Sequence, residues 1–218
     1  MGLQLSSDVR HVIADGRHIF LDIERDRYFG VSERTERALE RNRAGVPLLD
    51  DDRAALLPLI AAGLPGKDPT AGSQGPEIPA ARRSVLDDDA GPAPYWRVGG
   101  AVFHILVAKR LHRTAPLAHI LRRVDRIPIQ RKQPFDEAKL REHARAFHKA
   151  ALVTSTHDQC VPCSLALTVC LRRDAIPARL VMGVSGRPFA AHCWVQVGDR
   201  VVNDTLDHVI LFTPILIR

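Results

Sequence analysis

The sequence predicts an α+β protein with a small N-terminal part and a longer C-terminal part. Residues 3–31 contain three short apolar runs separated by turn signals and followed by helical patterns, which is typical of a small sheet with flanking helices. Residues 65–94 are rich in Gly, Pro, Asp and Ser, a composition typical of a flexible linker. Further helical patterns lead to alternating strands in residues 157–204. We therefore expect one domain at 1–64, a linker at 65–94 and a second domain at 95–218.

The composition is that of a globular protein, because 45% of the 218 residues are hydrophobic. All four cysteines follow residue 159, unlike a secreted disulfide framework, and no signal peptide is recognisable. The longest apolar run, Val98–Ala108, contains His104 and is far shorter than the roughly 20 residues of a membrane-spanning helix. We therefore expect a cytoplasmic protein that does not act at a membrane.

The net charge of +6 is unevenly spread, because Lys109–Lys132 contains eight Lys and Arg residues against a single acid, Asp125. A basic stretch of this kind can bind nucleic acid. No aromatic residue lies between Phe103 and Phe135, so the segment has no platform on which bases could stack. We therefore expect no nucleic-acid binding, and we interpret the block as a solvated helix face or a surface for an acidic protein partner.

The N-terminal part is predicted to begin with three strands, at His11–Asp15, His18–Ile23 and Arg27–Val31. Asp15-Gly16 is a strong signal for a tight hairpin between the first two strands. Ser32 is a good N-cap for a helix that runs to about residue 42. A second helix is expected at Arg53–Ala62, where Pro58 introduces a kink or a division.

The C-terminal part contains a thiol at the predicted start of a helix. Cys160 ends a polar turn, Pro162 suits a first helical turn, and an apolar series then runs to Arg172-Arg173. A thiol at a helix N-terminus lies in the positive end of the helix dipole, which favours the thiolate. Two earlier apolar stripes at helical spacing are expected to brace this helix: Val102, Ile105, Leu106 and Leu111, then Leu140, Ala144, Phe147 and Ala151.

Strands are expected after this helix, at Ala178–Gly183, Phe189–Val197 and, beyond the Gly198-Asp199 turn, Arg200–Asp204. Alternation places His192 on the polar face of a half-buried strand. Cys160 would then be the nucleophile, His192 its base and later the acid for the leaving amine, and Asp204 the carboxylate that fixes the imidazole tautomer. A strict two-residue turn would put Asp204 opposite Cys193, on the wrong face, so this triad requires a longer loop or a bulge.

This order of Cys, His and Asp resembles the papain-like transglutaminase superfamily, and most closely the leader peptidases of lasso-peptide biosynthesis, the B proteins. Their motifs are like Cys-Leu-Pro-x-Ser-Leu-Ala-Leu, Gly-Ile-Pro-Ala-Arg-Leu-Val-x-Gly-Val and Phe-x-x-His-Ala-Trp-Val-Glu-Val. This chain has Cys-Val-Pro-Cys-Ser-Leu-Ala-Leu, Ala-Ile-Pro-Ala-Arg-Leu-Val-Met-Gly-Val and Phe-Ala-Ala-His-Cys-Trp-Val-Gln-Val. The departures avoid the triad positions and are Cys163, Ala175, Cys193 and Gln196.

The N-terminal part resembles the PqqD-like winged-helix domains that recognise the leader peptides of ribosomally made natural products. The shared features are the Asp-Gly hairpin, the Tyr-Phe-Gly third strand and a final Leu-Ile-Ala-Ala-Gly-Leu. An open sheet edge can accept an extended peptide as a fourth strand, with a flanking helix supplying apolar contacts. The leader-binding residues expected on this basis are Arg27, Tyr28, Phe29, Leu56 and Ile60.

Together the resemblances imply a fused B protein, a leader-recognition domain joined to a cysteine peptidase. It would hydrolyse one amide bond of a lasso precursor and release the core peptide, without a metal or organic cofactor. The implied partners are the precursor and an ATP-dependent macrocyclase that resembles asparagine synthetase. Two alternatives remain, a transglutaminase-type acyltransferase with the same triad and a non-catalytic leader-binding scaffold.

The spacing Cys160-x-x-Cys163 allows two further interpretations. A thioredoxin-like redox pair would need a strand directly before the motif, whereas the preceding stretch is helical and then polar. A zinc site would need a second pair of ligands at suitable spacing, which the sequence does not show. Cys170 and Cys193 are expected to be packed, unreactive thiols.

Overall fold

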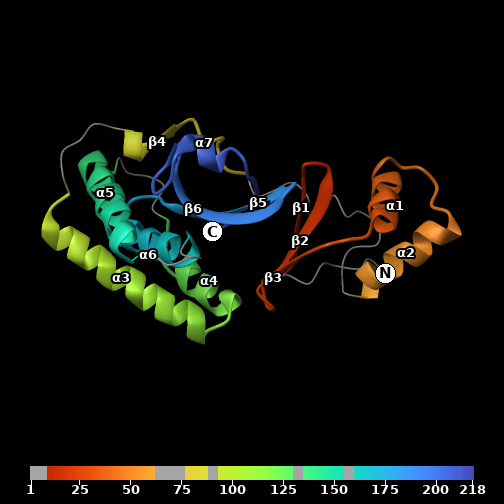
Figure 1. The fold of residues 1–218 in the computed structure, drawn as a ribbon, viewed down its shortest axis with the longest axis horizontal. Coiled ribbons are helices and arrows are strands. Elements are labelled where there is room, and N and C mark those ends of the chain that lie inside the picture. Colours follow the sequence, from red (N-terminus) through yellow and green to blue (C-terminus); the bar gives the residue numbers. More distant parts are fainter. Residues whose placement is uncertain (1–8, 62–76, 88–92, 130–134, 155–159) are drawn as a thin grey trace.

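The computed structural model describes residues 9–61, 77–87, 93–129, 135–154 and 160–218. It has the predicted α+β architecture, with a three-stranded sheet in the order β1-β2-β3 and a five-stranded sheet in the order β4-β7-β6-β5-β8 (Figure 1). The strands are β1 Val9–Ala14, β2 Arg17–Asp22, β3 Arg27–Gly30, β4 Arg83–Ser84, β5 Arg179–Gly186, β6 Phe189–Val197, β7 Arg200–Val201 and β8 Thr213–Ile217. The α-helices are α1 Glu33–Arg43, α2 Asp50–Ala61, α3 Tyr95–Thr114, α4 Leu117–Asp125, α5 Glu137–Thr154, α6 Cys160–Arg173 and α7 Leu206–Val209, and a 3₁₀ turn covers Val85–Asp87.

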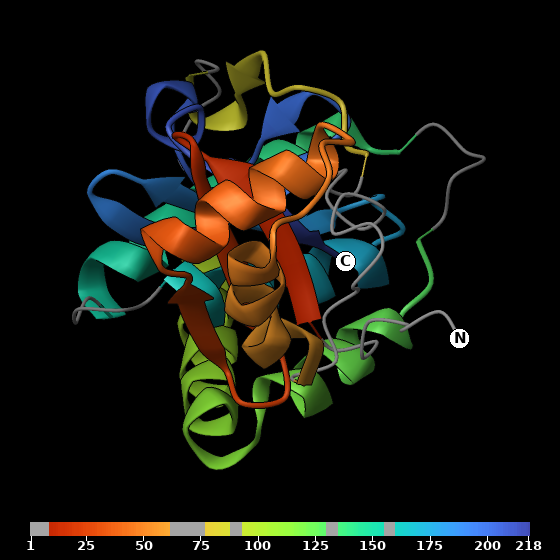
Figure 2. The same cartoon turned by 90° about the vertical axis from the view of Figure 1, so that its right-hand side faces the viewer.

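The N-terminal sheet and its two helices form as the local sequence predicts. Asp15 and Gly16 have φ angles of 49° and 73°, so both adopt the positive φ of a tight hairpin between β1 and β2. Ser32 caps α1, because its side chain accepts a hydrogen bond from the backbone N–H of Thr35 at 3.3 Å. The helices α1 and α2 cover one face of the sheet (Figure 2), and Phe20 lies in the core between them. The predicted strands and helices of this part are confirmed.

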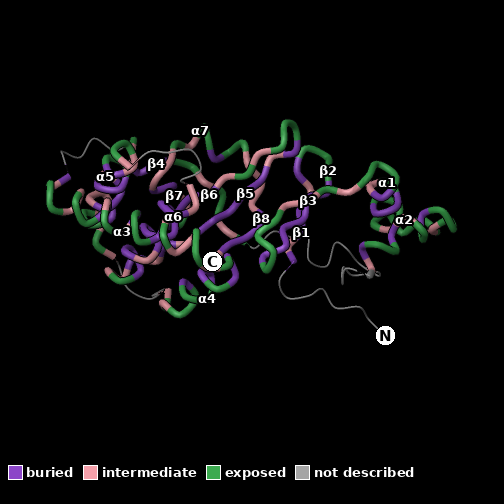
Figure 3. The backbone as a smooth tube through the Cα atoms, turned by 60° about the horizontal axis from the view of Figure 1, so that its bottom comes forward, coloured by how far each residue is buried: buried purple, intermediate pink, exposed green. Residues whose placement is uncertain are grey.

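The five-stranded sheet is covered by helices, and α6 lies at the centre of this arrangement. Most residues of α6 are buried, as the colouring by burial in Figure 3 indicates. Leu167 and Leu171 pack in one core with residues of α3 and α5. On the strand side, Val195 and Val197 of β6 belong to the same core. The start of α6 is therefore held in place by helices on one side and by the sheet on the other.

The two sheets pack against each other through a second core. It combines Leu21 of β2 with Leu165 of α6, Val184 of β5 and Leu216 of β8. The turn of the first hairpin is tied to the far sheet, because Asp15 accepts hydrogen bonds from the backbone N–H groups of Gly186 at 2.7 Å and Arg187 at 3.3 Å. The N-terminal sheet thus lies between its own helices and the C-terminal sheet.

Part of the expected linker is packed, which corrects the expectation of flexibility for residues 77–87. There β4 pairs in parallel with β7, and Ser84 and Val85 are buried. A two-residue strand gives no periodic signal, so its pairing with distant β7 could not be read from the sequence. Residues 65–76 and 88–92 of the linker lie outside the described residues, and the division into domains stays a prediction.

None of the described helices is both long and apolar enough to span a bilayer.

We predict that Gly186→Ala destabilises the protein, whereas Gly99→Ala does not. A Cβ at Gly186 would lie 2.4 Å from the carbonyl oxygen of Ala14, a backbone atom that cannot easily yield. We expect the substitution to lower the free energy of unfolding by about 1–3 kcal/mol. Urea denaturation of the full chain measures this change.

Gly99 is the matched control, because it lies in α3 and nothing approaches within 4 Å of its added Cβ. Alanine has the higher helix propensity, so Gly99→Ala should leave stability unchanged or raise it by up to about 1 kcal/mol. Equal losses in the two variants would contradict the close sheet-to-sheet contact.

Candidate active site

Cys160 is the first residue of α6 and is partly exposed, whereas the other three cysteines are buried. Pro162 occupies the first turn, where the absence of its N–H costs no hydrogen bond. The first N–H groups of a helix lack intrahelical acceptors and point toward its N-terminal end. The Cys160 sulfur therefore lies where a negative charge is favoured.

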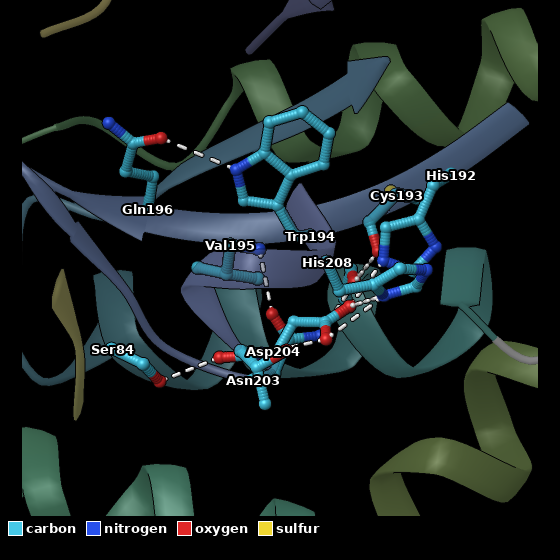
Figure 4. A network of polar contacts seen from close by, with 11 residues as sticks. Ser84, His192, Cys193, Trp194, Val195, Gln196, Asn203, Asp204 and His208 are labelled. Atoms are coloured by element: carbon cyan, nitrogen blue, oxygen red, sulfur yellow. Dashed lines mark hydrogen bonds and ion pairs between the residues drawn. The ribbon is translucent and has the colours of Figure 1, made fainter. Parts of the chain in front are cut away.

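His192 of β6 and Asp204 interact directly, as Figure 4 shows. Nε2 of His192 hydrogen-bonds to Oδ2 of Asp204. The prediction that Asp204 lies within hydrogen-bond reach of His192 is confirmed, but Asp204 lies beyond the end of β7 and not on the strand beside His192. Interaction with the Cys160 thiol also raises the pKa of His192, so the imidazole that bonds to Asp204 lies near this thiol.

Asp204 reaches His192 because the chain leaves the sheet early. The turn at Gly198-Asp199 is a tight two-residue one, with Val197 paired to Arg200 and Gln196 to Val201. The third strand expected at Arg200–Asp204 ends at Val201, which corrects its predicted length. The irregularity that brings Asp204 to the same side as His192 therefore lies after β7, where the chain leaves the sheet, and not in the turn between β6 and β7.

A network of hydrogen bonds made by side chains fixes the point at which the chain leaves the sheet. Asn203 accepts a hydrogen bond from the backbone N–H of Val195 at 2.8 Å, in place of a strand partner. Its amide group donates to Oγ of Ser164 at 2.9 Å, and Ser164 donates to the carbonyl oxygen of Cys193 at 2.9 Å. These bonds join α6, β6 and the segment that carries Asp204.

Asp204 is held by several further groups. Its carboxylate accepts a hydrogen bond from the backbone N–H of Thr205 at 2.7 Å and interacts with Nδ1 of His208 at 3.0 Å. Its carbonyl oxygen accepts from Ser84 Oγ at 2.6 Å. Burial acts to raise the pKa of Asp204, but the bonds with His192, Thr205 and His208 lower it below the ordinary value.

The pKa of His192 is shifted in the opposite direction, to about 9. Burial of the ring opposes the charged form, but the hydrogen bond with Asp204 and the interaction with Cys160 outweigh it. With a pKa of about 9, His192 is protonated at neutral pH, and its positive charge lies where it can favour a negative charge on a nearby sulfur. A thiolate beside an imidazolium is the reactive form of a cysteine nucleophile.

The other thiols lack these features. Burial raises the pKa of Cys163 and of Cys170 to about 11, and raises that of Cys193 well above its ordinary value. The expectation that Cys170 and Cys193 are packed thiols agrees with their burial. Among the described residues, the group with metal-ligand proximity is His192, Asp204 and His208, which includes neither Cys160 nor Cys163.

The five expected leader-binding residues lie in different environments. Arg27 is exposed on β3, which is the edge strand of its sheet. Tyr28 packs toward the C-terminal sheet, with its ring 5.8 Å from that of Phe189, whereas Phe29 faces the N-terminal core. In that core Ile60 is half-buried and Leu56 is 6% exposed.

Tyr28 also lies near the candidate nucleophile. Burial raises its pKa above the ordinary value, and the charges of Cys193 and Cys160 add to the shift. Tyr28 of the edge strand and Cys160 at the start of α6 pack against the same core.

The sequence did not single out Ser164, Asn203, His208 or Ser84 as parts of the site. Ser164 is a polar residue within an apolar helical series, which is a weak signal for a buried hydrogen bond. Asn203 and His208 act through contacts that exist only after folding. His157, three residues before Cys160, lies outside the described residues.

We predict that Asp204→Asn lowers the pKa of His192 by more than about one unit, because burial then opposes the charged ring with one partner fewer. In the native chain the imidazole should titrate near 9. NMR titration of the histidine Cε1 signals measures both values, with His192→Gln identifying the resonance.

Glu137→Gln is the matched control, since it removes a carboxylate that pairs with Arg200 at 2.5 Å and does not contact His192. The pH dependence of stability is a second readout. A pKa raised from 6.5 to about 9 stabilises the fold fully below pH 6.5, and this contribution is lost as pH rises to 9. An unchanged His192 titration in Asp204→Asn would contradict the assigned pairing.

Comparisons with known proteins identify the family of this chain. Residues 103–217, more than half of the chain, match the transglutaminase-like superfamily. A segment of 45 residues is 47% identical to the microcin J25-processing protein McjB of Escherichia coli, and it covers 21% of this chain and 22% of that protein. The match thus spans about a fifth of the length of this curated relative. No solved structure matches the chain. Cys160, His192 and Asp204 all lie within the matched residues, and the chain belongs to the transglutaminase-like superfamily.

Proposed function

We propose that this protein is the leader peptidase of a lasso-peptide pathway, which binds the leader of a precursor and hydrolyses one amide bond. The observation that carries the proposal is the imidazole of His192, which is hydrogen-bonded to Asp204 and whose pKa is raised by Asp204 and by Cys160 at the start of α6. Membership of the transglutaminase-like superfamily supports a thiol-dependent reaction at a carbonyl. Similarity to a protein named for processing microcin J25 supports a peptide as the substrate.

The geometry suits acyl transfer to water in two steps. The Cys160 thiolate adds to the scissile carbonyl, and the oxyanion is stabilised by N–H groups at the start of α6. His192 then donates its proton to the leaving amine, the C–N bond breaks, and a thioester to Cys160 remains. Neutral His192 next accepts a proton from water, which attacks the thioester and releases the leader as a carboxylate. Asp204 keeps the imidazole oriented throughout.

The N-terminal sheet and helices would supply leader recognition. The free edge of β3 can accept an extended peptide as a further strand, and Arg27 is exposed there. Tyr28 packs on the core shared with Cys160, so a peptide that follows β3 is directed toward the nucleophile. Because Leu56 lies inside the N-terminal core, we assign it to supporting this surface rather than to direct contact.

The released core peptide would carry a new N-terminal amine. We propose that an ATP-dependent macrocyclase resembling asparagine synthetase consumes this amine by forming the ring, and that both enzymes act in the cytoplasm. The peptidase chemistry itself requires proton transfer and a nucleophile, which His192 and Cys160 provide without a metal or organic cofactor.

We predict that Cys160→Ala abolishes leader removal, whereas Cys163→Ala retains most of it. Cys160 is partly exposed and contributes to the raised pKa of His192, while Cys163 is buried with a pKa raised to about 11. The assay is mass spectrometry of precursor peptide incubated with each full-length variant, together with the cyclase and ATP.

Iodoacetamide labelling at neutral pH is the independent control, and it should modify Cys160 before the buried thiols. The product mass separates hydrolysis, which adds one water, from acyl transfer to an added amine. Cleavage that survives Cys160→Ala and fails in Cys163→Ala would refute the nucleophile. Preferred amine transfer would favour the acyltransferase alternative, and leader binding without cleavage would favour the scaffold.

We also predict that leader peptide slows backbone hydrogen exchange at Arg27–Gly30 in the full-length Cys160→Ala variant. A peptide added to the edge of β3 would pair with N–H groups that otherwise face solvent. Hydrogen-exchange mass spectrometry with and without leader measures the effect. Central β2 already pairs on both sides and is the internal control. Exchange unchanged in β3 under saturating leader would exclude edge-strand addition.

A further inference from the structure

A groove on the face formed by α3, α4 and α6 takes no part in the proposed reaction. Its volume is about 620 Å³, a size typical of binding sites. The three helices lie together below the C-terminal sheet in Figure 1. Most of the lining is apolar, and Phe103, Val107 and Leu111 of α3 recur there at intervals of four residues.

The apolar lining reaches the surface. Phe103 is 63% exposed and Val107 is 49% exposed, and both line the groove. Large apolar side chains gathered in an open depression are typical of a surface that a partner covers. The opposite wall is made by Ile120 and Val124 of α4, and Leu165 of α6 also contributes.

The charges at this groove all have one sign. Arg123, Arg126 and Arg173 line it, and no Asp or Glu does. Within the described part of the chain, none of these three arginines forms an ion pair. Asp125, the acid of the basic block, pairs instead with Arg218. The groove therefore offers three uncompensated positive charges around an apolar floor.

We propose that this groove binds an acidic amphipathic helix of a partner protein. Apolar residues of three helices line a trough into which one further helix can lay an apolar face. The stripe from Phe103 to Leu111 covers about two helical turns, roughly 12 Å. The bound helix would place apolar residues at i, i+4 and i+7 in the trough and Asp or Glu against Arg123, Arg126 and Arg173.

Other occupants fit these features less well. Nucleic acid could contact the arginines, but its bases would have little to stack on. Phe103 is the single Phe, Tyr or Trp among the described lining residues, and apolar side chains form the floor. An anionic membrane surface would be met by a convex basic face better than by a concave trough. The charge complementarity therefore favours an acidic protein segment.

The test uses the full-length protein and two fluorescein-labelled synthetic helical peptides of about 14 residues, roughly 21 Å long. Both carry leucine at i, i+4, i+7 and i+11, and one has glutamate on its other face where the second has lysine. Fluorescence anisotropy should show micromolar binding of the acidic peptide, weakened by added salt, and at least about tenfold weaker binding of the basic one.

Neighbouring residues on the same helices supply matched controls. Val107→Asp should weaken binding of the acidic peptide by at least about tenfold, whereas Leu106→Asp should change it less than about twofold. Leu106 is 53% exposed but does not line the groove. Likewise Arg123→Glu should weaken binding and Arg122→Glu should not, because Arg122 is exposed outside the groove. If Val107→Asp fails to fold by thermal melting, Phe103→Asp replaces it.

A charge swap makes the test independent of simple loss of function. The double variant with Arg123→Glu and Arg126→Glu should bind the lysine peptide more tightly than the native chain does. Absence of acidic-peptide binding, or equal effects of the groove and control variants, would overturn the proposal. The proposal would also be overturned if the acidic peptide does not bind but phosphatidylserine vesicles, RNA or a second copy of the chain does, and if Arg123→Glu or Val107→Asp abolishes that binding.

Discussion

One buried hydroxyl group holds the parts of the candidate site in register. Ser164 is 0% exposed, donates a hydrogen bond to the carbonyl oxygen of Cys193 and accepts one from the amide of Asn203. These contacts fix the helix of Cys160, the strand of His192 and the segment before Asp204 relative to one another. Replacing the hydroxyl would leave the partly buried amide of Asn203 and the carbonyl of Cys193 without this partner, which costs more than the hydrogen bond itself contributes. The position of the nucleophile thus depends on polar contacts in the core as well as on apolar packing.

The same core extends to the N-terminal sheet. Leu21 of β2 packs with Leu165 of α6, and Asp15 ties the first hairpin to Gly186 at the end of β5. Leader recognition in the proposed function would therefore be coupled to chemistry by a packed interface, not through residues 65–94 alone. An interface with fixed geometry limits which bond of an extended peptide can reach Cys160, because each extended residue spans at most about 3.6 Å.

Local chemistry in the sequence predicted much of this structure, and distant pairing produced the differences. Asp15-Gly16 and Ser32 determine their own turn and cap, so the N-terminal elements could be located without a structure. The two-residue strand β4 is stabilised by β7, more than a hundred residues later, and has no periodicity of its own. The chain's departure after Val201 depends on Asn203 meeting Val195 and Ser164, which no local pattern encodes. The order and spacing of residues predicted that His192 and Asp204 share one site. They did not predict the course of the backbone between these two residues.

The distribution of thiols around the site has an electrostatic consequence. Cys163 and Cys193 lie close enough to Cys160 for its charge to raise the pKa of both, in addition to the effect of their burial. A negative charge at Cys160 would therefore oppose ionisation of its two neighbours. Burial also removes Cys163 and Cys193 from solvent, which limits their access to oxidants and substrates. Three cysteines can thus share this region, because Cys160 alone among them is partly exposed and Cys163 and Cys193 are buried.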